Sequence, residues 1–204
     1  HAESLPPQIR FIVDQAGVAL SDVDAVAVDV GPGLFTGLRV GITTAMSLAW
    51  ALGVPVVTAT SLELLAFAAA TDGREVMAVV DARRGEVFHA RYRRTSDGMT
   101  QMSSPAVASP AAVASSLATS AANRGDNVLV VGDGARTHID VFRGIDGVDV
   151  APTGFDRPSA AALVSLATPV VERGEFVDPT DVAPLYLREP DAKAKWDPAA
   201  GTPS

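Results

Sequence analysis

The chain has 204 residues, of which 48% are hydrophobic and 20% charged, a balance that suits one large domain or two small ones. Its net charge of −8 disfavours unassisted tight binding to nucleic acid or to anionic membranes. The sequence has no cysteine, which excludes disulfides, thiolate metal sites and a cysteine nucleophile. No apolar run approaches the length of a membrane span, so we expect a cytoplasmic protein without a membrane partner.

The first third of the chain predicts alternating helices and strands. Apolar residues recur at the spacing of one helix face: Leu5, Ile9, Ile12, Val13 and Ala16. This spacing predicts an amphipathic helix over 5–16, which Ser4 is placed to cap and Gly17 to end. A strand, a helix, a strand and a second helix are then predicted: 25–30, 38–52, 54–57 and 60–70. This order is typical of a parallel α/β unit.

The pattern changes near residue 72. Strands over 75–80 and 87–94 predict an antiparallel hairpin with glycine at its turn. The later predicted elements are a helix, a strand, a helix and a last ordered segment: 110–122, 128–131, 158–167 and 182–188. We therefore expect an α/β protein with lobes over 1–72 and 73–188, followed by a disordered tail over 189–204.

A glycine-rich loop joins the first strand to the following helix, and four of its residues are Gly31, Pro32, Gly33 and Gly37. Such a loop either cradles an anion at a helix N-terminus or forms a tight turn that brings two backbones together. No Lys-Ser/Thr pair follows the glycines, and their spacing differs from a G-x-G-x-x-G fingerprint. We favour the tight turn, because nothing else that binds phosphate converges there in the sequence.

The helix over 38–52 is apolar on almost every side, with a narrow polar strip at Arg39, Thr43 and Ser47. A helix of this kind needs cover on two sides. One side can pack on the sheet, and the other requires a neighbouring helix or another subunit. Burial within one chain is the alternative interpretation.

The arginines of the hairpin and the few histidines are the other candidate functional residues. Arg83, Arg84, Arg91, Arg93 and Arg94 either contact RNA or, as we favour, form a solvated face. The sequence has three histidines, and we interpret His89 and His138 as ordinary surface or turn residues. No G-x-S-x-G motif is present, and 132–134 is interpreted as a turn.

Several segments, taken together and in this order, resemble the tRNA threonylcarbamoyladenosine biosynthesis proteins of the TsaB type: 1–6, 31–66, 79–88, 131–135 and 184–188. The resemblance implies an actin-like (ASKHA) fold of two ribonuclease H-like lobes. Family members begin with strands that carry an Asp-Thr-Ser loop, and these are absent here. We therefore expect a first lobe without its N-terminal strands.

The resemblance also implies a non-catalytic subunit, with no catalytic residues, metal or cofactor of its own. Its expected partners are a TsaD-type catalytic subunit and a TsaE-type ATPase, with tRNA reached only indirectly through the complex. The expected docking residues lie on the two helices: Leu5, Ile9, Ile12, Val13, Leu38, Arg39, Ile42, Ala45, Met46 and Ala49. When the chain is alone, we expect it to form a homodimer through them.

Two enzyme hypotheses stay open beside this one. The first is an ATP-dependent actin-fold transferase or kinase that acts alone, and the second is a glycoprotease-like peptidase. TsaD relatives bind metal through a His-x-x-x-His pair, and this sequence has no histidine between residues 2 and 88. That absence argues against metal-dependent chemistry of the TsaD kind.

Overall fold

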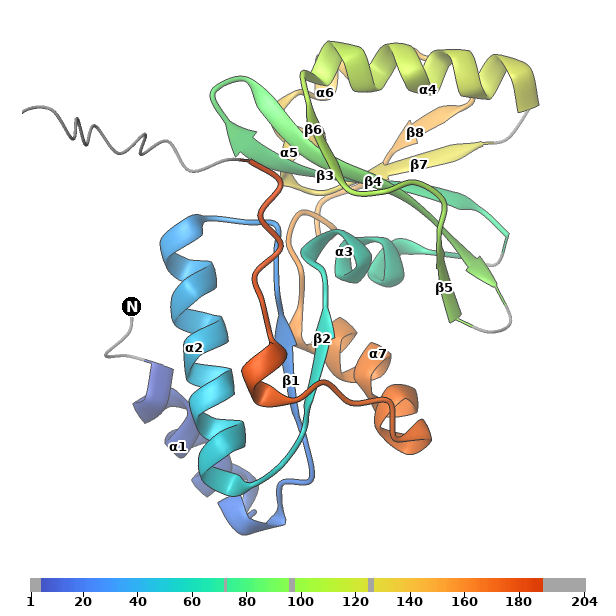
Figure 1. The fold of residues 1–204 in the computed structure, drawn as a ribbon. Coiled ribbons are helices and arrows are strands. Elements are labelled where there is room, and N and C mark those ends of the chain that lie inside the picture. Colours follow the sequence, from blue (N-terminus) through green and yellow to red (C-terminus); the bar gives the residue numbers. More distant parts are fainter. Residues whose placement is uncertain (1–4, 72, 96–97, 125–126, 189–204) are drawn as a thin grey trace, which may run out of the picture.

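The computed structural model describes residues 5–71, 73–95, 98–124 and 127–188 (Figure 1). The predicted cap at Ser4, His1 and the predicted tail over 189–204 lie outside the described residues. The described part is a mixed α/β structure with two separate sheets.

The first sheet has two strands and confirms the predicted parallel unit. Its elements in chain order are α1 (Leu5–Ala16), η1 (Leu20–Asp22), β1 (Val26–Asp29), α2 (Phe35–Leu52), β2 (Val56–Ala59) and α3 (Ser61–Ala69). Strands β1 and β2 pair in parallel, with Val26 opposite Val56. The predicted second strand, 54–57, was placed two residues early. Thr60 caps α3 as expected, since its Oγ1 accepts a hydrogen bond of 3.1 Å from the Glu63 backbone N–H.

The second sheet is larger and runs in the order β5-β4-β3-β7-β8, with β6 also paired to β4. Its strands are β3 (Glu75–Arg83), β4 (Glu86–Thr95), β5 (Gly98–Gln101), β6 (Ala106–Ala108), β7 (Val128–Val131) and β8 (Val148–Val150). The predicted antiparallel hairpin is β3–β4, while β7 pairs in parallel with both β3 and β8. The sequence analysis did not find β5, β6 or β8.

Helices cover both faces of the second sheet (Figure 1). On one face, α3 packs Leu62, Leu65 and Ala66 against Val76 and Tyr92 of the sheet. The opposite face is covered by the remaining helices of this half: α4 (Pro110–Arg124), α5 (Asp133–Thr137) and α6 (Ile139–Phe142). Thus α3 connects the two sheets, because it follows the first in the chain and packs on the second.

The end of the described chain returns to the first sheet. Helix α7 (Ala160–Arg173) contacts β1, β2 and α3, and η2 (Pro179–Asp181) contacts α2. The backbone N–H of Leu185 also donates to the Val30 carbonyl at 2.8 Å. Both α7 and η2 thus lie against the first sheet, although they follow residue 72 in the chain. The division into lobes at residue 72 stays a prediction. Helix α7 contains Pro169 and ends at Arg173, six residues beyond its predicted end. The next residue, Gly174, has a φ of 69°, in the left-handed region, and terminates the helix.

Candidate partner-docking surface

The glycine loop is held in place by the carboxylate of Asp29, the last residue of β1. Its oxygens accept hydrogen bonds from the Gly31 backbone N–H at 2.8 Å and from Ser61 Oγ at 2.7 Å. The Ser61 backbone N–H in turn donates to the Gly31 carbonyl at 2.8 Å. These bonds join the loop to the first turn of α3, so a carboxylate of the chain itself already satisfies the Gly31 N–H. This arrangement favours the tight-turn interpretation.

Burial raises the pKa of Asp29, an effect that its hydrogen bonds to Gly31 and Ser61 partly offset. Gly31 has a φ of 95°, and a Cβ placed there would lie 2.9 Å from Leu38 Cδ2. Glycine is therefore required where the loop meets α2. Gly37 belongs to α2 instead, because the helix begins at Phe35 and not at residue 38.

One face of α2 is core, which corrects the expected docking set at Ile42 and Ala49. Five of its predicted docking residues pack in the cluster formed with β1 and β2: Leu38, Ile42, Ala45, Met46 and Ala49. Ile42 is 4% exposed and Ala49 is fully buried. The helical spacing of these apolar residues does not show whether they face the sheet or a partner. In the structure they face the first sheet. Ile42 and Ala49 are therefore unavailable to a partner while the chain is folded, whereas Leu38, Ala45 and Met46 are half-buried and their docking role stays a prediction.

Helix α1 lies on the outer side of α2 and has no buried residue. Its predicted residues Leu5, Ile9 and Val13 are half-buried, and Ile9 borders a hollow of about 430 Å³ that Thr43 and Leu48 of α2 also line. Ile12 remains 64% exposed. The helix is thus only partly covered within this chain.

Other large apolar side chains are exposed on the same two helices, and the sequence analysis missed them. Phe11 is 64% exposed beside Ile12, and Trp50 is 79% exposed near the end of α2. The remaining candidate, Arg39, is engaged elsewhere, since its Nε donates to Tyr186 Oη at 2.8 Å. We call Phe11, Ile12 and the half-buried residues Leu5, Ile9 and Val13 the α1 surface.

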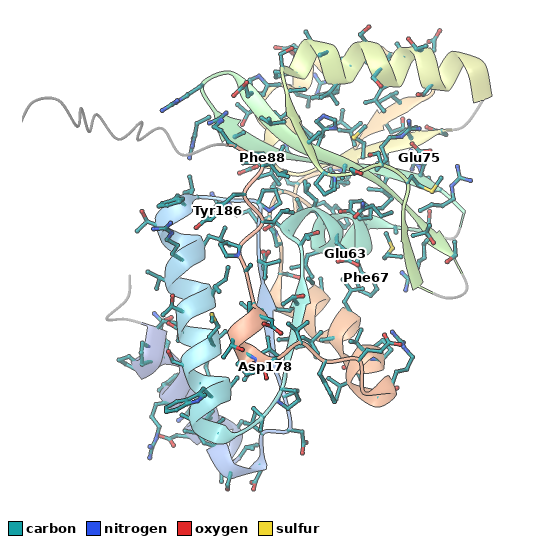
Figure 2. The ribbon with its side chains drawn as sticks, viewed as in Figure 1. Glu63, Phe67, Glu75, Phe88, Asp178 and Tyr186 are labelled. Carbon is teal, nitrogen blue, oxygen red and sulfur yellow. The ribbon has the colours of Figure 1, made fainter. Side chains whose placement is uncertain are left out.

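The arginines of β4 are paired and partly buried, which contradicts a solvated face. Arg91 forms a hydrogen-bonded ion pair with Glu75, which is 1% exposed, and Arg93 lies 3.5 Å from the same carboxylate. Figure 2 shows Glu75 within the second sheet. His89 is half-buried in the middle of β4 and is neither a surface nor a turn residue, and burial lowers its pKa.

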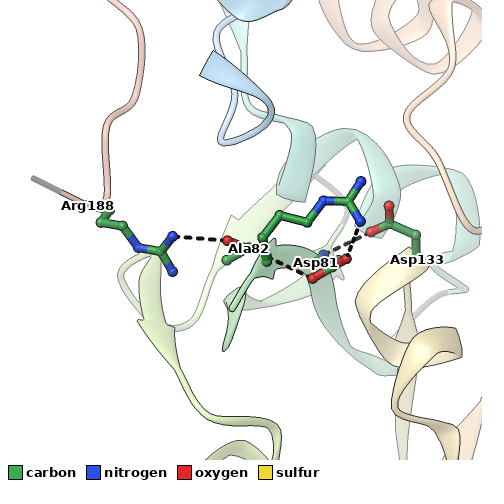
Figure 3. Close-up of polar contacts among 5 residues, drawn as sticks. Asp81, Ala82, Asp133 and Arg188 are labelled. Carbon is green, nitrogen blue, oxygen red and sulfur yellow. Dashed lines mark hydrogen bonds and ion pairs between the residues drawn. The ribbon is translucent and has the colours of Figure 1, made fainter. Parts of the chain in front are cut away.

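The segment 132–134 opens helix α5 and is more than a turn. A Cβ on Gly132 would lie 2.1 Å from the Val79 carbonyl oxygen, so glycine is needed for α5 to pack on β3. Asp133 Oδ1 accepts a hydrogen bond of 2.9 Å from the Asp81 backbone N–H (Figure 3). This carboxylate therefore joins the helix to the strand.

Among the residues that the structure describes, no group of three or more His, Cys, Asp or Glu side chains is arranged to hold a metal ion. Within the same residues, no helix combines the length and hydropathy needed to cross a membrane.

Comparison with known proteins finds matches among proteins described by their role in tRNA modification. Residues 1–196 match the family model described as TsaD, tRNA N6-adenosine threonylcarbamoyltransferase. The chain is 30% identical over 199 residues to TsaB of Haemophilus influenzae, with 92% of this chain and 80% of that protein covered. It is 38% identical to an uncharacterized protein of Mycobacterium leprae, of which it spans 46%.

Two solved structures agree with this result. One, described as a protein similar to peptidase YeaZ from Pseudomonas aeruginosa, matches with a TM-score of 0.76 and 34% identity. The match covers 92% of this chain and 84% of that one. YeaZ from the same organism matches with a TM-score of 0.74 and 33% identity. The chain therefore belongs to the TsaB/YeaZ family of TsaD-like proteins.

Proposed function

We propose that the chain is a non-catalytic docking subunit, which binds a TsaD-type catalytic subunit in a complex that forms threonylcarbamoyladenosine in tRNA. A TsaE-type ATPase is the expected third member. The observation that carries the proposal is α1, a 12-residue helix without a buried residue. A short helix in water gains most of its stability from packing its apolar face, so α1 requires a further surface.

The proposed contact is the α1 surface, with Phe11 and Ile12 at its centre. Both side chains are 64% exposed, and large apolar side chains that become buried contribute most of the energy of an interface. In the absence of the partner, we expect two copies of the chain to pair through the same surface. We also propose that the two sheets belong to the two lobes of an actin-like fold.

Co-purification with a TsaD-type protein tests the proposal, with Ile12→Asp as the disrupting variant. We expect this variant to remain folded and to lose the partner, because the new carboxylate would be buried at the interface without a counter-ion. Val164→Asp is the matched control, since Val164 is 62% exposed on α7. Equal retention of the partner by both variants would contradict the proposed surface.

The enzyme hypotheses predict a different outcome when the isolated chain is incubated with ATP. An actin-fold kinase or transferase acting alone would hydrolyse or transfer phosphate from ATP without any partner. We expect no turnover of ATP by the chain alone, and formation of modified tRNA only when the partner proteins are added. Stoichiometric ATP binding with turnover by the isolated chain would refute the docking role.

A further inference from the structure

A hollow of about 660 Å³ opens beside the end of α2, between that helix and the segment 176–180. We call it the α2-end hollow. Two large aromatic side chains border it: Trp50, which is 79% exposed, and Phe176, which is 44% exposed. Pro55 and Pro179 add apolar walls with restricted backbones. The volume falls within the range of about 300–1,000 Å³ that is typical of small-ligand sites, so it is enough to hold a long side chain.

The α2-end hollow lies on a different side of α2 from the α1 surface. Helix α1 and η2 both contact α2, and they lie on either side of it (Figure 1). The hollow between α1 and α2 is lined by Thr43, Thr44, Ser47 and Leu48, and none of these residues lines the α2-end hollow. A segment bound in the α2-end hollow therefore need not cover α1.

Trp50 has no polar or aromatic partner within the part of the chain that the structure describes. Its ring makes no stacking or cation contact there, and its indole N–H donates no hydrogen bond. Among aromatic side chains, the tryptophan ring attracts a cation most strongly. Trp50 therefore offers the hollow an aromatic ring that can bind a cation.

The charge at the hollow is negative. Of the described residues that line it, only Asp178 is charged, and Figure 2 shows Asp178 beside η2. The hydroxyl and the backbone N–H of Thr180 donate to Asp178 Oδ1 at 2.5 and 2.8 Å, which lowers the pKa of this carboxyl and keeps it ionised. Its Oδ2 has no partner among the described residues. The preceding basic residue in the sequence, Arg173, is already paired with Glu175 at 2.8 Å.

The end of α2 adds to this negative charge. Gly53 ends the helix and also lines the hollow. The C-terminus of a helix carries a partial negative charge, and α2 has no basic residue in its last turn to balance it. An aromatic ring, a carboxylate and a helix C-terminus thus favour a cation in the same space.

We propose that the α2-end hollow is a second protein-docking site, which binds an arginine side chain on an extended segment of a partner protein. A guanidinium group can stack on an aromatic ring while it donates hydrogen bonds to a carboxylate, and Trp50 and Asp178 supply these two partners. Arginine suits the site better than lysine, because its planar group is less strongly hydrated. The apolar walls at Phe176 and Pro55 suit the residues on either side of the arginine. The inference goes beyond the proposed docking role of α1 and does not depend on it.

NMR titration of the full chain with the pentapeptide acetyl-Ala-Pro-Arg-Pro-Ala-amide tests the inference. We expect saturable shifts of the Trp50 indole N–H and of the Thr180 amide. A peptide with citrulline in place of arginine keeps the shape without the charge, and we expect it to bind at least fivefold more weakly. Equal binding of the two peptides, or no saturable shift with the arginine peptide, would overturn the inference.

Substitutions of the two recognition residues locate the site, with the Thr180 amide as the reporter. Trp50→Leu removes the ring, and Asp178→Asn removes the charge but keeps an oxygen that can accept from Thr180. We expect each to weaken the arginine peptide at least fivefold, whereas Asp140→Asn, at an exposed position on α6, should bind as the parent does. Because Trp50 and Asp178 are exposed, the unfolding temperature should stay unchanged, which separates lost binding from lost folding. Full binding by both variants would overturn the inference.

Two further titrations identify the occupant. Tighter binding of spermidine than of the arginine peptide would assign the site to a free polyamine and overturn the protein-docking assignment. Ile12→Asp should bind the peptide unchanged, because Ile12 belongs to the α1 surface. Loss of the peptide by this variant would place the peptide on α1 and overturn the inference. Retention of the TsaD-type partner by Trp50→Leu would leave the docking role of α1 intact, so the two proposals fail separately.

Discussion

Replacing Ile42 by alanine should destabilise the chain strongly, because α2 presents this residue to the core. Ile42 is 4% exposed and packs with Val28, Val30 and Val56 of the first sheet. The substitution removes three buried carbon atoms at about 0.8 kcal/mol each, and the residual cavity adds to this. We therefore expect the free energy of unfolding to fall by about 3 kcal/mol and the unfolding temperature by roughly 6–12 °C.

Urea unfolding followed by tryptophan fluorescence measures this change, with Trp50 on α2 itself as a reporter. Ile12→Ala is the matched control, since the same side chain is 64% exposed on α1 and its truncation should cost less than about 0.5 kcal/mol. A loss below about 1 kcal/mol for Ile42→Ala, or equal losses for both variants, would refute the assignment of the core face of α2.

Two further predictions concern buried carboxyl groups. Glu75→Gln should lower the free energy of unfolding by about 3 kcal/mol, because it leaves the half-buried charge of Arg91 without its counter-ion. Glu175→Gln removes a carboxylate from the exposed pair with Arg173, and it should have no measurable effect in the same urea assay. Burial raises the pKa of Asp29 above its ordinary value of 3.8, so the folded state holds this proton more tightly, and stability should fall as pH rises from 3.8 through the raised value. Asp29→Asn should remove that slope from urea midpoints measured across the interval, and an unchanged slope would contradict this explanation.

The regular elements with strong periodicity could be predicted from the sequence. The parallel pair β1–β2, the hairpin β3–β4 and helix α4 each carry a clear apolar pattern or turn signal. The short strands β5, β6 and β8 do not, since three or four residues hold too little pattern. Such strands form because β4 or β7 offers a free edge to pair with, which is a tertiary effect.

The candidate site was harder to predict for two physical reasons. Because α2 is apolar on nearly all sides, its sequence pattern does not indicate which side packs on the sheet. Ile42 and Ala49 were therefore predicted to contact a partner subunit. The contact of Arg39 with Tyr186 joins residues 147 positions apart, and no local spacing signals it. The loop glycine Gly31 was predictable as a tight-turn residue, although its carboxylate partner Asp29 was not.

Amide hydrogen exchange across α1, with and without a TsaD-type partner, tests the docking role most directly. We predict fast exchange over 5–16 in the chain alone and strong protection of the same amides in the complex, because α1 has no buried residue until a partner covers it. Helix α7 should show no such change. Exchange over 5–16 that stays the same on complex formation would contradict the proposed docking surface.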